Sequence, residues 1–193
     1  MVGVLALQGD FGKHKSILDK LKVDSVYVRD SLELEKTKAL IIPGGESTTL
    51  SMLIDRFGIR ESLKKYSKKF SVFGTCAGMI MLSSSKDRKV RDNVKVLNIM
   101  DFSISRNSWG TQIDSFEKEV NLDQFNIDSF NAVFIRAPKV VEIGDSISKV
   151  GYFNREAIIL DDGKHLACSF HPELEDDIRI HKYFLDRFYY DKR

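Results

Sequence analysis

The pattern of apolar and polar positions divides the first half of the chain into short strands and longer helical segments. Apolar runs that end in polar or glycine-containing loops predict strands at residues 2–7, 25–28, 39–42 and 70–73. Apolar residues three and four apart predict helices at residues 14–21 and 46–63, the second with a break at Gly58. Strands that alternate with helices at such short separations indicate a parallel sheet covered on both faces.

The second half changes to a series of short β-like runs. They lie at residues 94–99, 132–136, 140–143, 157–160 and 165–170, and an Asp-Asp-Gly-Lys turn between the last two predicts a hairpin. An amphipathic pattern at residues 176–190 predicts a closing helix. We expect one α/β domain over residues 1–193, with three layers: a mostly parallel sheet flanked by helices, and extra antiparallel strands.

Composition excludes several classes of protein and partner. The chain has 193 residues, of which 42% are hydrophobic and 30% charged, as in an ordinary globular protein. A net charge of +2 without a long block of one sign gives no indication of nucleic acid or a membrane surface as partner. Two cysteines give no disulfide framework and indicate a reducing, cytoplasmic setting. No Cys/His cluster has the spacing of metal ligands, so we expect no metal.

The stretch from residue 70 to 82 is the one around which the chain is organised. A short apolar strand leads into Gly74-Thr-Cys76-Ala-Gly78 and then into good helix formers, which is the form of a nucleophile elbow with sulfur in place of oxygen. Glycines two residues on either side allow neighbouring backbone to approach closely, and a helix N-terminus favours thiolate. A buried structural cysteine in a glycine-rich turn fits this stretch equally well.

A second glycine-containing loop, at residues 43–49, also joins a strand to a helix. Gly44 and Gly45 expose backbone N–H groups at the start of the helix, an arrangement that binds anions or an oxyanion. The Gly-Lys-Ser/Thr ending of a phosphate-binding loop is missing. The simpler alternative is a turn with an N-cap from Ser47 or Thr48.

A candidate base follows the last predicted strand. A cysteine nucleophile needs a group that takes its proton and a third group that orients the base. His171 stands at a strand end, Pro172 stiffens the backbone there, and Glu173 is close enough to accept the other ring N–H. A strand-end histidine beside a surface glutamate is the alternative. The weaker candidates are His14, His165 and His181, and Cys168 lies in an apolar run typical of an inert thiol.

Two arginines could recognise a carboxylate. Arg136 ends an apolar strand before Ala137-Pro138, and Arg106 begins a polar turn ahead of Trp109. A guanidinium at a strand end can hold a carboxylate by two parallel hydrogen bonds. A surface salt bridge is the ordinary alternative for each of them.

Taken together and in order, these segments resemble the glutaminase subunits of pyridoxal 5′-phosphate synthases, which are class I (triad) glutamine amidotransferases. The resemblance runs from Leu5 to Leu174, so it covers almost the whole chain. The segments that carry it are Leu5-Ala-Leu-Gln-Gly9, Pro43-Gly-Gly-Glu-Ser-Thr48, Gly74-Thr-Cys-Ala-Gly-Met79, Arg106-Asn107, Phe134-Ile-Arg-Ala-Pro138 and Phe170-His-Pro-Glu-Leu174.

The resemblance implies a role for each of these segments. Cys76 would be the nucleophile, His171 the base and Glu173 the carboxylate that orients it. Glutamine would be bound by Gly45, Glu46, Ser47, Arg106, Ile135 and Arg136. The backbone N–H groups of Gly44, Gly45 and Ala77 would form the oxyanion hole.

The same resemblance implies a partner. L-Glutamine would be hydrolysed to glutamate and ammonia, without a cofactor. The ammonia would pass to a (β/α)₈-barrel synthase subunit in a large hetero-oligomer that builds pyridoxal 5′-phosphate. The free subunit would be poorly active until that partner docks, and we expect docking near the N-terminal strand and the elbow.

The chain departs from the family pattern at a few positions. Trp109 replaces a usual Phe, Glu175 a usual Thr, and Thr111 a usual Arg, which removes a positive charge. The alternatives are a glutaminase that serves another synthase, a different cysteine hydrolase such as a peptidase, and a catalytically silent binding subunit. Retention of Cys76, His171 and Glu173 argues against the last of these.

Overall fold

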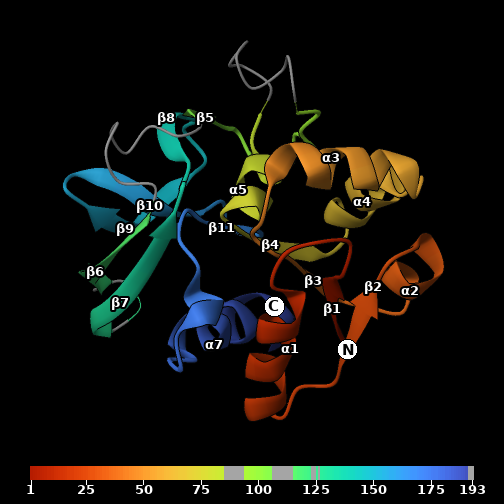
Figure 1. Cartoon of the computed structure of the whole chain (residues 1–193), viewed down its shortest axis with the longest axis horizontal. Helices are drawn as coiled ribbons and strands as arrows, with labels where there is room; N and C mark the ends of the chain where they lie inside the picture. Colours follow the sequence, from red (N-terminus) through yellow and green to blue (C-terminus); the bar gives the residue numbers. More distant parts are fainter. Residues whose placement is uncertain (85–93, 106–114, 123–124, 126, 191–193) are drawn as a thin grey trace.

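A seven-stranded sheet forms the centre of the computed structural model, which describes residues 1–84, 94–105, 115–122, 125 and 127–190. The strand order is β2-β1-β3-β4-β11-β10-β9 (Figure 1). The first five strands are parallel, and β10 pairs antiparallel with both β11 and β9. The bounds are β1 (Val2–Leu5), β2 (Ser25–Val28), β3 (Ala39–Ile42), β4 (Ser71–Thr75), β9 (Ser148–Phe153), β10 (Glu156–Asp161) and β11 (Leu166–Cys168).

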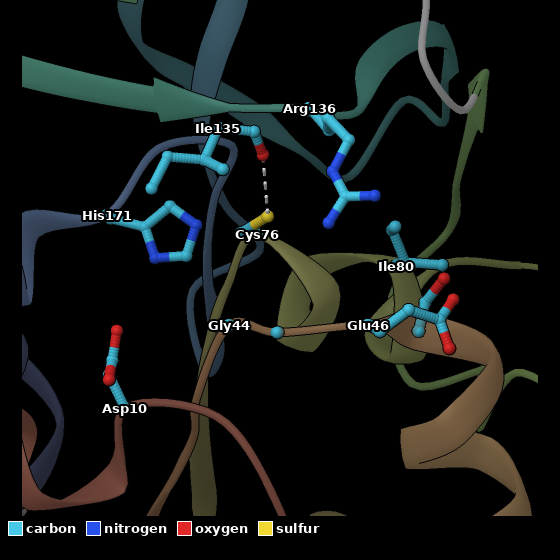
Figure 2. A pocket seen from close by; sticks show the side chains of 10 residues that line it. Asp10, Gly44, Glu46, Cys76, Ile80, Ile135, Arg136 and His171 are labelled. Carbon is cyan, nitrogen blue, oxygen red and sulfur yellow. Dashed lines mark hydrogen bonds between the residues drawn. The ribbon is translucent and has the colours of Figure 1, made fainter. Parts of the chain in front are cut away.

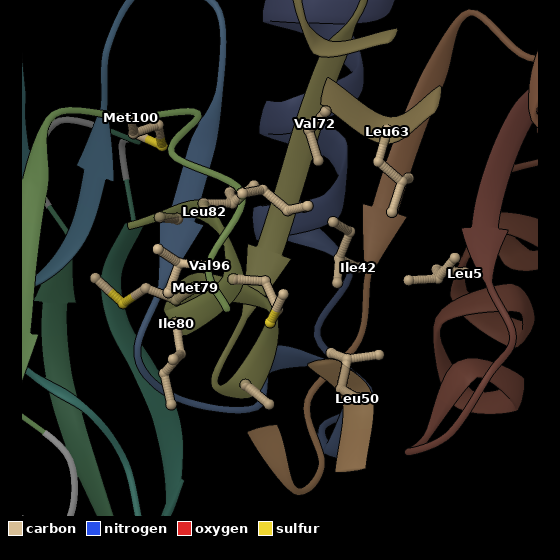
Figure 3. Close-up of a cluster of buried hydrophobic side chains, with 14 of the residues drawn as sticks. Leu5, Ile42, Leu50, Leu63, Val72, Met79, Ile80, Leu82, Val96 and Met100 are labelled. Atoms are coloured by element: carbon tan, nitrogen blue, oxygen red, sulfur yellow. The ribbon is translucent and has the colours of Figure 1, made fainter. Parts of the chain in front are cut away.

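Helices cover both faces of this sheet, which gives the three layers that the sequence predicts (Figure 1). In β3, Leu40 and Ile42 pack with α3, α4 and α5 on one face (Figure 3), whereas Ala39 and Ile41 pack with α1 and α7 on the other. This alternation follows from the two-residue period of a strand. The helices are α1 (Phe11–Lys20), α2 (Ser31–Glu35), α3 (Ser47–Arg56), α4 (Arg60–Ser67), α5 (Ala77–Leu82) and α7 (Arg179–Leu185).

Two antiparallel ribbons stand beside the sheet. One pairs β5 (Phe102–Ser105) with β8 (Lys139–Ile143), and the other pairs β6 (Ser115–Leu122) with β7 (Ile127–Ile135). Apolar side chains of the second ribbon, among them Phe130 and Phe134, pack against Phe170 in the loop after β11. This packing brings the end of β7 to the carboxyl edge of the central sheet.

Several sequence-based predictions are confirmed and others are wrong. The long helical segment does break at Gly58, which has φ +67°, and the chain resumes as α4. The strand predicted at residues 94–99 is wrong. Its backbone N–H groups at Leu97 and Ile99 donate to the carbonyls of Met81 and Leu82 at the end of α5, and its apolar side chains join the core there. Packing on the end of α5 therefore buries the apolar side chains of this run and gives its N–H groups acceptors, without a strand partner.

The closing helix is shorter than its pattern predicts. It begins at Arg179 rather than at residue 176, and after Leu185 it continues as the π-helical turn η3 (Asp186–Tyr190). The pattern did not predict α2, β5, β6 or β9. None of the helices in the described residues is long and apolar enough to cross a membrane.

Candidate active site

The predicted elbow is present. β4 ends at Thr75, α5 begins at Ala77, and Cys76 stands between them with φ +47° and ψ −105°. A non-glycine residue in this left-handed region is strained, and such conformations persist where the surrounding structure enforces them. Here the Cys76 N–H donates to the carbonyl of Cys168 in the neighbouring strand at 2.8 Å. The strand-to-helix turn therefore holds the sulfur at the N-terminus of α5.

Glycines make this turn possible by close approach. A Cβ added to Gly78 would lie 2.0 Å from the carbonyl oxygen of Ile42, so α5 could not start against β3. A Cβ on Gly44 would lie 2.3 Å from Cε1 of His171 and 3.2 Å from Cβ of Cys76. The two glycine-containing loops therefore pack closely against each other around the thiol, as the glycines on either side of Cys76 and at positions 44 and 45 suggest.

His171 and Glu173 complete a line of three side chains. His171 follows β11, and its N–H donates to the carbonyl of Val133 at 2.9 Å, which ties it to the β6–β7 ribbon. Its Nδ1 lies 2.7 Å from Oε1 of Glu173, in the short helix η2 (Pro172–Leu174). Both side chains are buried. The carboxylate therefore fixes the ring, with the other ring nitrogen left for the thiol.

Electrostatics within this line favour a charged pair. Burial would lower the pKa of His171, but hydrogen bonding with Cys76 and Glu173 and their negative charges outweigh burial and raise it to about 10. Burial would raise the pKa of Glu173, but the neighbouring His14 and His171 lower it to about 2. An imidazolium at His171 supplies the positive charge that a thiolate nucleophile needs beside it.

A cavity of about 290 Å³ opens in front of the sulfur. Figure 2 shows Cys76 directed toward the carbonyl of Ile135, 3.7 Å from the sulfur, with the guanidinium of Arg136 beside it. The lining residues are Asp10, Gly44, Gly45, Glu46, Ser47, Cys76, Ile80, Ile135, Arg136 and His171. One guanidinium and two carboxylates around a small cavity suit a zwitterionic amino acid, because each charge finds an opposite one.

The loop after β3 differs from the simpler sequence prediction. Neither Ser47 nor Thr48 caps α3. The carboxylate of Glu46 does, since it accepts from the N–H groups of Thr48 at 3.0 Å and Thr49 at 2.6 Å. Burial would raise the pKa of Glu46, but these two N–H groups lower it to about 2. Glu46 therefore carries its negative charge at the cavity wall.

The structure brings together nearly all the predicted site residues that it describes. The cavity wall includes the predicted glutamine-binding residues Gly45, Glu46, Ser47, Ile135 and Arg136, and Ala77 begins the helix beside the thiol. Arg106, Trp109 and Thr111 lie outside the described residues. No group of three or more His, Cys, Asp or Glu within the described ranges is placed to hold a metal ion.

Two lining residues were not predicted. Asp10 follows the loop after β1, and its place at the carboxyl edge of a strand was a signal that could have found it. Ile80 lies one helical turn beyond Cys76, where its apolar character is also that of an ordinary core residue. The sequence alone does not distinguish a cavity-lining role of Ile80 from a core role, and the structure places this residue at the cavity.

Comparison with known proteins agrees with this geometry. Residues 4–190 match the model of the SNO glutamine amidotransferase family. The chain is 44% identical over 186 residues to pyridoxal 5′-phosphate synthase subunit PdxT of Thermosipho africanus, which covers 96% of this chain and 97% of that protein. It is 45% identical over 187 residues to the same subunit of Pseudothermotoga lettingae, covering 96% and 94%.

Solved structures give the same result at the level of the fold. A crystal structure described as a glutamine amidotransferase superposes with a TM-score of 0.87 at 39% identity, covering 96% of this chain and 97% of that one. A putative GMP synthase subunit of Thermoplasma acidophilum superposes with a TM-score of 0.66 at 18% identity, covering 96% and 92%. The second likeness concerns the fold alone.

Proposed function

The chain belongs to the SNO glutamine amidotransferase family, and on that premise we propose that Cys76, His171 and Glu173 are its catalytic triad for glutamine hydrolysis. It is the glutaminase subunit of a pyridoxal 5′-phosphate synthase. The observation that carries the triad is the line of three side chains that leads from Cys76 and His171 on the cavity wall to the buried Glu173. The sulfur stands on a strained elbow beside His171, and the ring is held by Glu173 at 2.7 Å.

The first half of the reaction forms a thioester. The thiolate of Cys76 attacks the side-chain amide carbon of glutamine, and the electron pair of the C=O bond moves to the oxygen. When the tetrahedral intermediate collapses, the C–N bond breaks and protonated His171 gives its proton to the departing nitrogen. The products of this half are ammonia and a glutamyl thioester on Cys76.

The second half releases glutamate. His171, now neutral, takes a proton from a water molecule as that water attacks the thioester carbonyl. Collapse of the second tetrahedral intermediate breaks the C–S bond and returns the thiolate. Throughout, Glu173 keeps the His171 ring in one orientation and balances its positive charge.

The oxyanion that forms in each half needs donors on the cavity wall. Ala77 N–H lies at the N-terminus of α5, next to the nucleophile, and the Gly44–Gly45 loop reaches the same cavity. The carbonyl of Gly44 is directed at Gly9, close enough that a Cβ on Gly9 would meet it at 1.8 Å. In a trans peptide this directs the Gly45 N–H away from Gly9. Loss of one such donor commonly costs about 3 kcal/mol of transition-state stabilisation.

Charges around the cavity orient the substrate. Arg136, at the end of β7, binds the α-carboxylate of glutamine, and the carboxylates of Glu46 and Asp10 attract its α-ammonium group. The side-chain amide is then directed to Cys76. Arg106 is expected to add a second contact to the carboxylate.

The ammonia has a second subunit as its destination. This partner is the synthase subunit, for which we propose a (β/α)₈ barrel in a large hetero-oligomer. We place its docking surface at the N-terminal strand and the elbow, because ammonia must leave the cavity at this edge without meeting bulk water. Cross-links that placed the partner only on residues 176–190 would contradict this surface.

The triad is tested by glutamate release from glutamine, with and without the synthase subunit. We expect partner-stimulated release by the native chain and none by Cys76→Ala, since removal of a nucleophile costs about 10⁴-fold or more. Cys168→Ala is the matched control, because its sulfur is fully buried in β11, donates to the carbonyl of Phe170 at 3.5 Å and does not line the cavity. No release under any condition, with the partner bound, would instead indicate a silent binding subunit.

A further inference from the structure

Two histidines that the reaction does not use lie buried directly behind the triad. His14 on α1 and His181 on α7 are both 0% exposed, although 167 residues separate them in the chain. Nδ1 of His14 lies 2.8 Å from Nε2 of His181, and the ring centroids are 5.1 Å apart. Buried imidazoles cost free energy unless they are hydrogen-bonded, so a pair of them beside a catalytic carboxylate calls for an explanation.

His14 also faces Glu173. Its Nε2 lies 3.4 Å from Oε2 of Glu173 and 3.3 Å from the hydroxyl of Thr75, the residue before the nucleophile. Within the described residues Oε2 accepts no hydrogen bond, whereas Oε1 accepts one from His171. A buried carboxylate oxygen without a donor is unfavourable. At 3.4 Å this contact is longer than a usual N–H···O hydrogen bond, but it places the His14 ring beside the oxygen that lacks a donor.

The ring protons follow from the same contacts. Burial lowers the pKa of His14, despite Glu173 and Asp10 nearby, and burial together with His14 lowers that of His181 to about 3. Each ring therefore carries one proton. If Nε2–H of His181 donates to Nδ1 of His14, the proton of His14 is on Nε2 and faces Glu173.

The opposite assignment is unfavourable at both ends. It would put a proton on Nδ1 of His181, which finds no acceptor among the described residues. It would also turn the lone pair of His14 Nε2 toward the Glu173 carboxylate. Of the two assignments, only the first gives the N–H of each ring an acceptor among the described residues, so the chain of donors runs from His181 through His14 to Thr75 and Glu173.

We propose that His14, held in one tautomer by His181, is a positioning residue for the catalytic carboxylate. Its Nε2–H stabilises the second oxygen of Glu173, which keeps that carboxylate ionised and aligned with His171. Neither histidine touches the substrate. Because the same nitrogen reaches Thr75, the ring also ties the carboxylate to the strand that carries Cys76. This inference rests on the proposed triad.

The pH dependence of turnover gives a readout that a purely structural role would not move. The titratable groups around Glu173 are His171 beside it, His14 on α1 with Asp10 ahead of it, His181 on α7 and Cys168 on β11. Loss of a donor to a carboxylate raises its pKa. Glu173 would then take up a proton at a higher pH, and the acid limb of kcat would move to higher pH.

The test compares His14→Leu with His14→Gln in partner-supported glutamate release. We expect His14→Leu to lower kcat at least tenfold with little change in KM, and to move the acid limb up by about one pH unit. His14→Gln should recover most of both, because its side-chain amide can place an N–H where Nε2 was. His181→Phe keeps a ring against Phe73 and should act in the same direction with a smaller effect.

His165→Leu is the matched control. His165 is also buried, but its Nδ1 accepts only from the N–H of Val72 at 3.1 Å, away from the triad. Its loss should lower stability and leave the acid limb in place.

The proposal is overturned if His14→Leu and His14→Gln lose equal activity, or if the acid limb stays fixed while kcat follows only the folded fraction. If His14→Leu fails to fold, the kcat and the acid limb of His14→Gln and His181→Phe test the proposal instead. Activity that survives Cys76→Ala would overturn the triad itself, a separate outcome.

Discussion

Two buried thiols at adjoining strand ends of one sheet differ in backbone conformation, in the charges around them and in access to a cavity. Cys76 and Cys168 belong to neighbouring strand ends and share a hydrogen bond from the N–H of one to the carbonyl of the other. Cys168 is the last residue of β11 and is fully buried, and burial raises the pKa of its thiol well above the ordinary value. Cys76 stands in left-handed backbone at a helix N-terminus, beside an imidazolium and a cavity. Both thiols are buried, so their backbone position and surroundings, rather than burial alone, distinguish the two.

The largest expected effect is a difference in alkylation rate between these two thiols. In the folded chain iodoacetamide should modify Cys76 at least about 100-fold faster than Cys168, because Cys76 lines the cavity beside His171, whereas burial raises the pKa of the Cys168 thiol. Peptide mass spectrometry at timed intervals measures the two rates separately. In denaturant the rates should become equal, and a difference that persisted there would show that the fold is not its cause.

The next effect concerns the backbone that supports Cys76. Gly78→Ala should lower the free energy of unfolding by about 2 kcal/mol or more, since its Cβ would lie 2.0 Å from the Ile42 carbonyl oxygen. Gly12→Ala is the matched control, because nothing lies within 4 Å of its Cβ in α1. That change should be neutral or stabilise by up to about 1 kcal/mol. Denaturant unfolding of both variants checks the pair, and equal destabilisation would contradict the close-approach explanation.

A third effect concerns how the free energy of unfolding depends on pH, and it distinguishes the buried carboxylate of the triad from an exposed one. The pKa of Glu173 falls from its ordinary 4.5 to about 2 on folding, which is worth about 3 kcal/mol. Because the folded pKa is depressed, this stability is present above pH 4.5 and is lost as pH falls toward 2. Glu173→Gln should flatten the dependence of unfolding free energy on pH in that window. Asp176→Asn removes a carboxylate whose pKa is lowered by Lys20 but which is fully exposed, so it should flatten the same window much less.

Much of the fold and of the site around Cys76 could be predicted from the sequence, for physical reasons. Continuous apolar runs identify the buried parallel strands, and Gly-x-Cys-x-Gly identifies the elbow. The meeting of Cys76 with His171, 95 positions later, follows from parallel strands whose carboxyl ends share one edge, as the register of β11 against β4 confirms. What the apolar pattern did not predict lies mostly at the margins of the sheet. In β6, five of eight residues are polar or charged, because only one face of the ribbon is covered.

The contacts of the two histidines behind the triad could not be predicted from the sequence either. His14 and His181 each look like an ordinary residue of an amphipathic helix, and only the packing of α1 and α7 on one face of the sheet joins them. The same holds for residues 94–99, whose apolar pattern is that of a strand but whose partner is the end of α5. Long-range packing therefore decides which elements meet and, at residues 94–99, whether the local pattern becomes a strand at all.

The smallest effect separates substrate binding from helix capping at Glu46. Glu46→Gln should weaken the N-cap of α3 by about 1 kcal/mol and also raise KM for glutamine, because the carboxylate faces both the helix and the cavity. Asp30→Asn is the matched control, since Asp30 caps α2 through the N–H of Glu33 at 2.8 Å and does not line the cavity. It should cost similar or less stability and leave KM unchanged. Steady-state kinetics of the complex and thermal unfolding of the chain measure the two quantities independently. If KM rises equally in both variants, the charge of Glu46 has no part in recognition, and Asp10 remains as the carboxylate opposite Arg136.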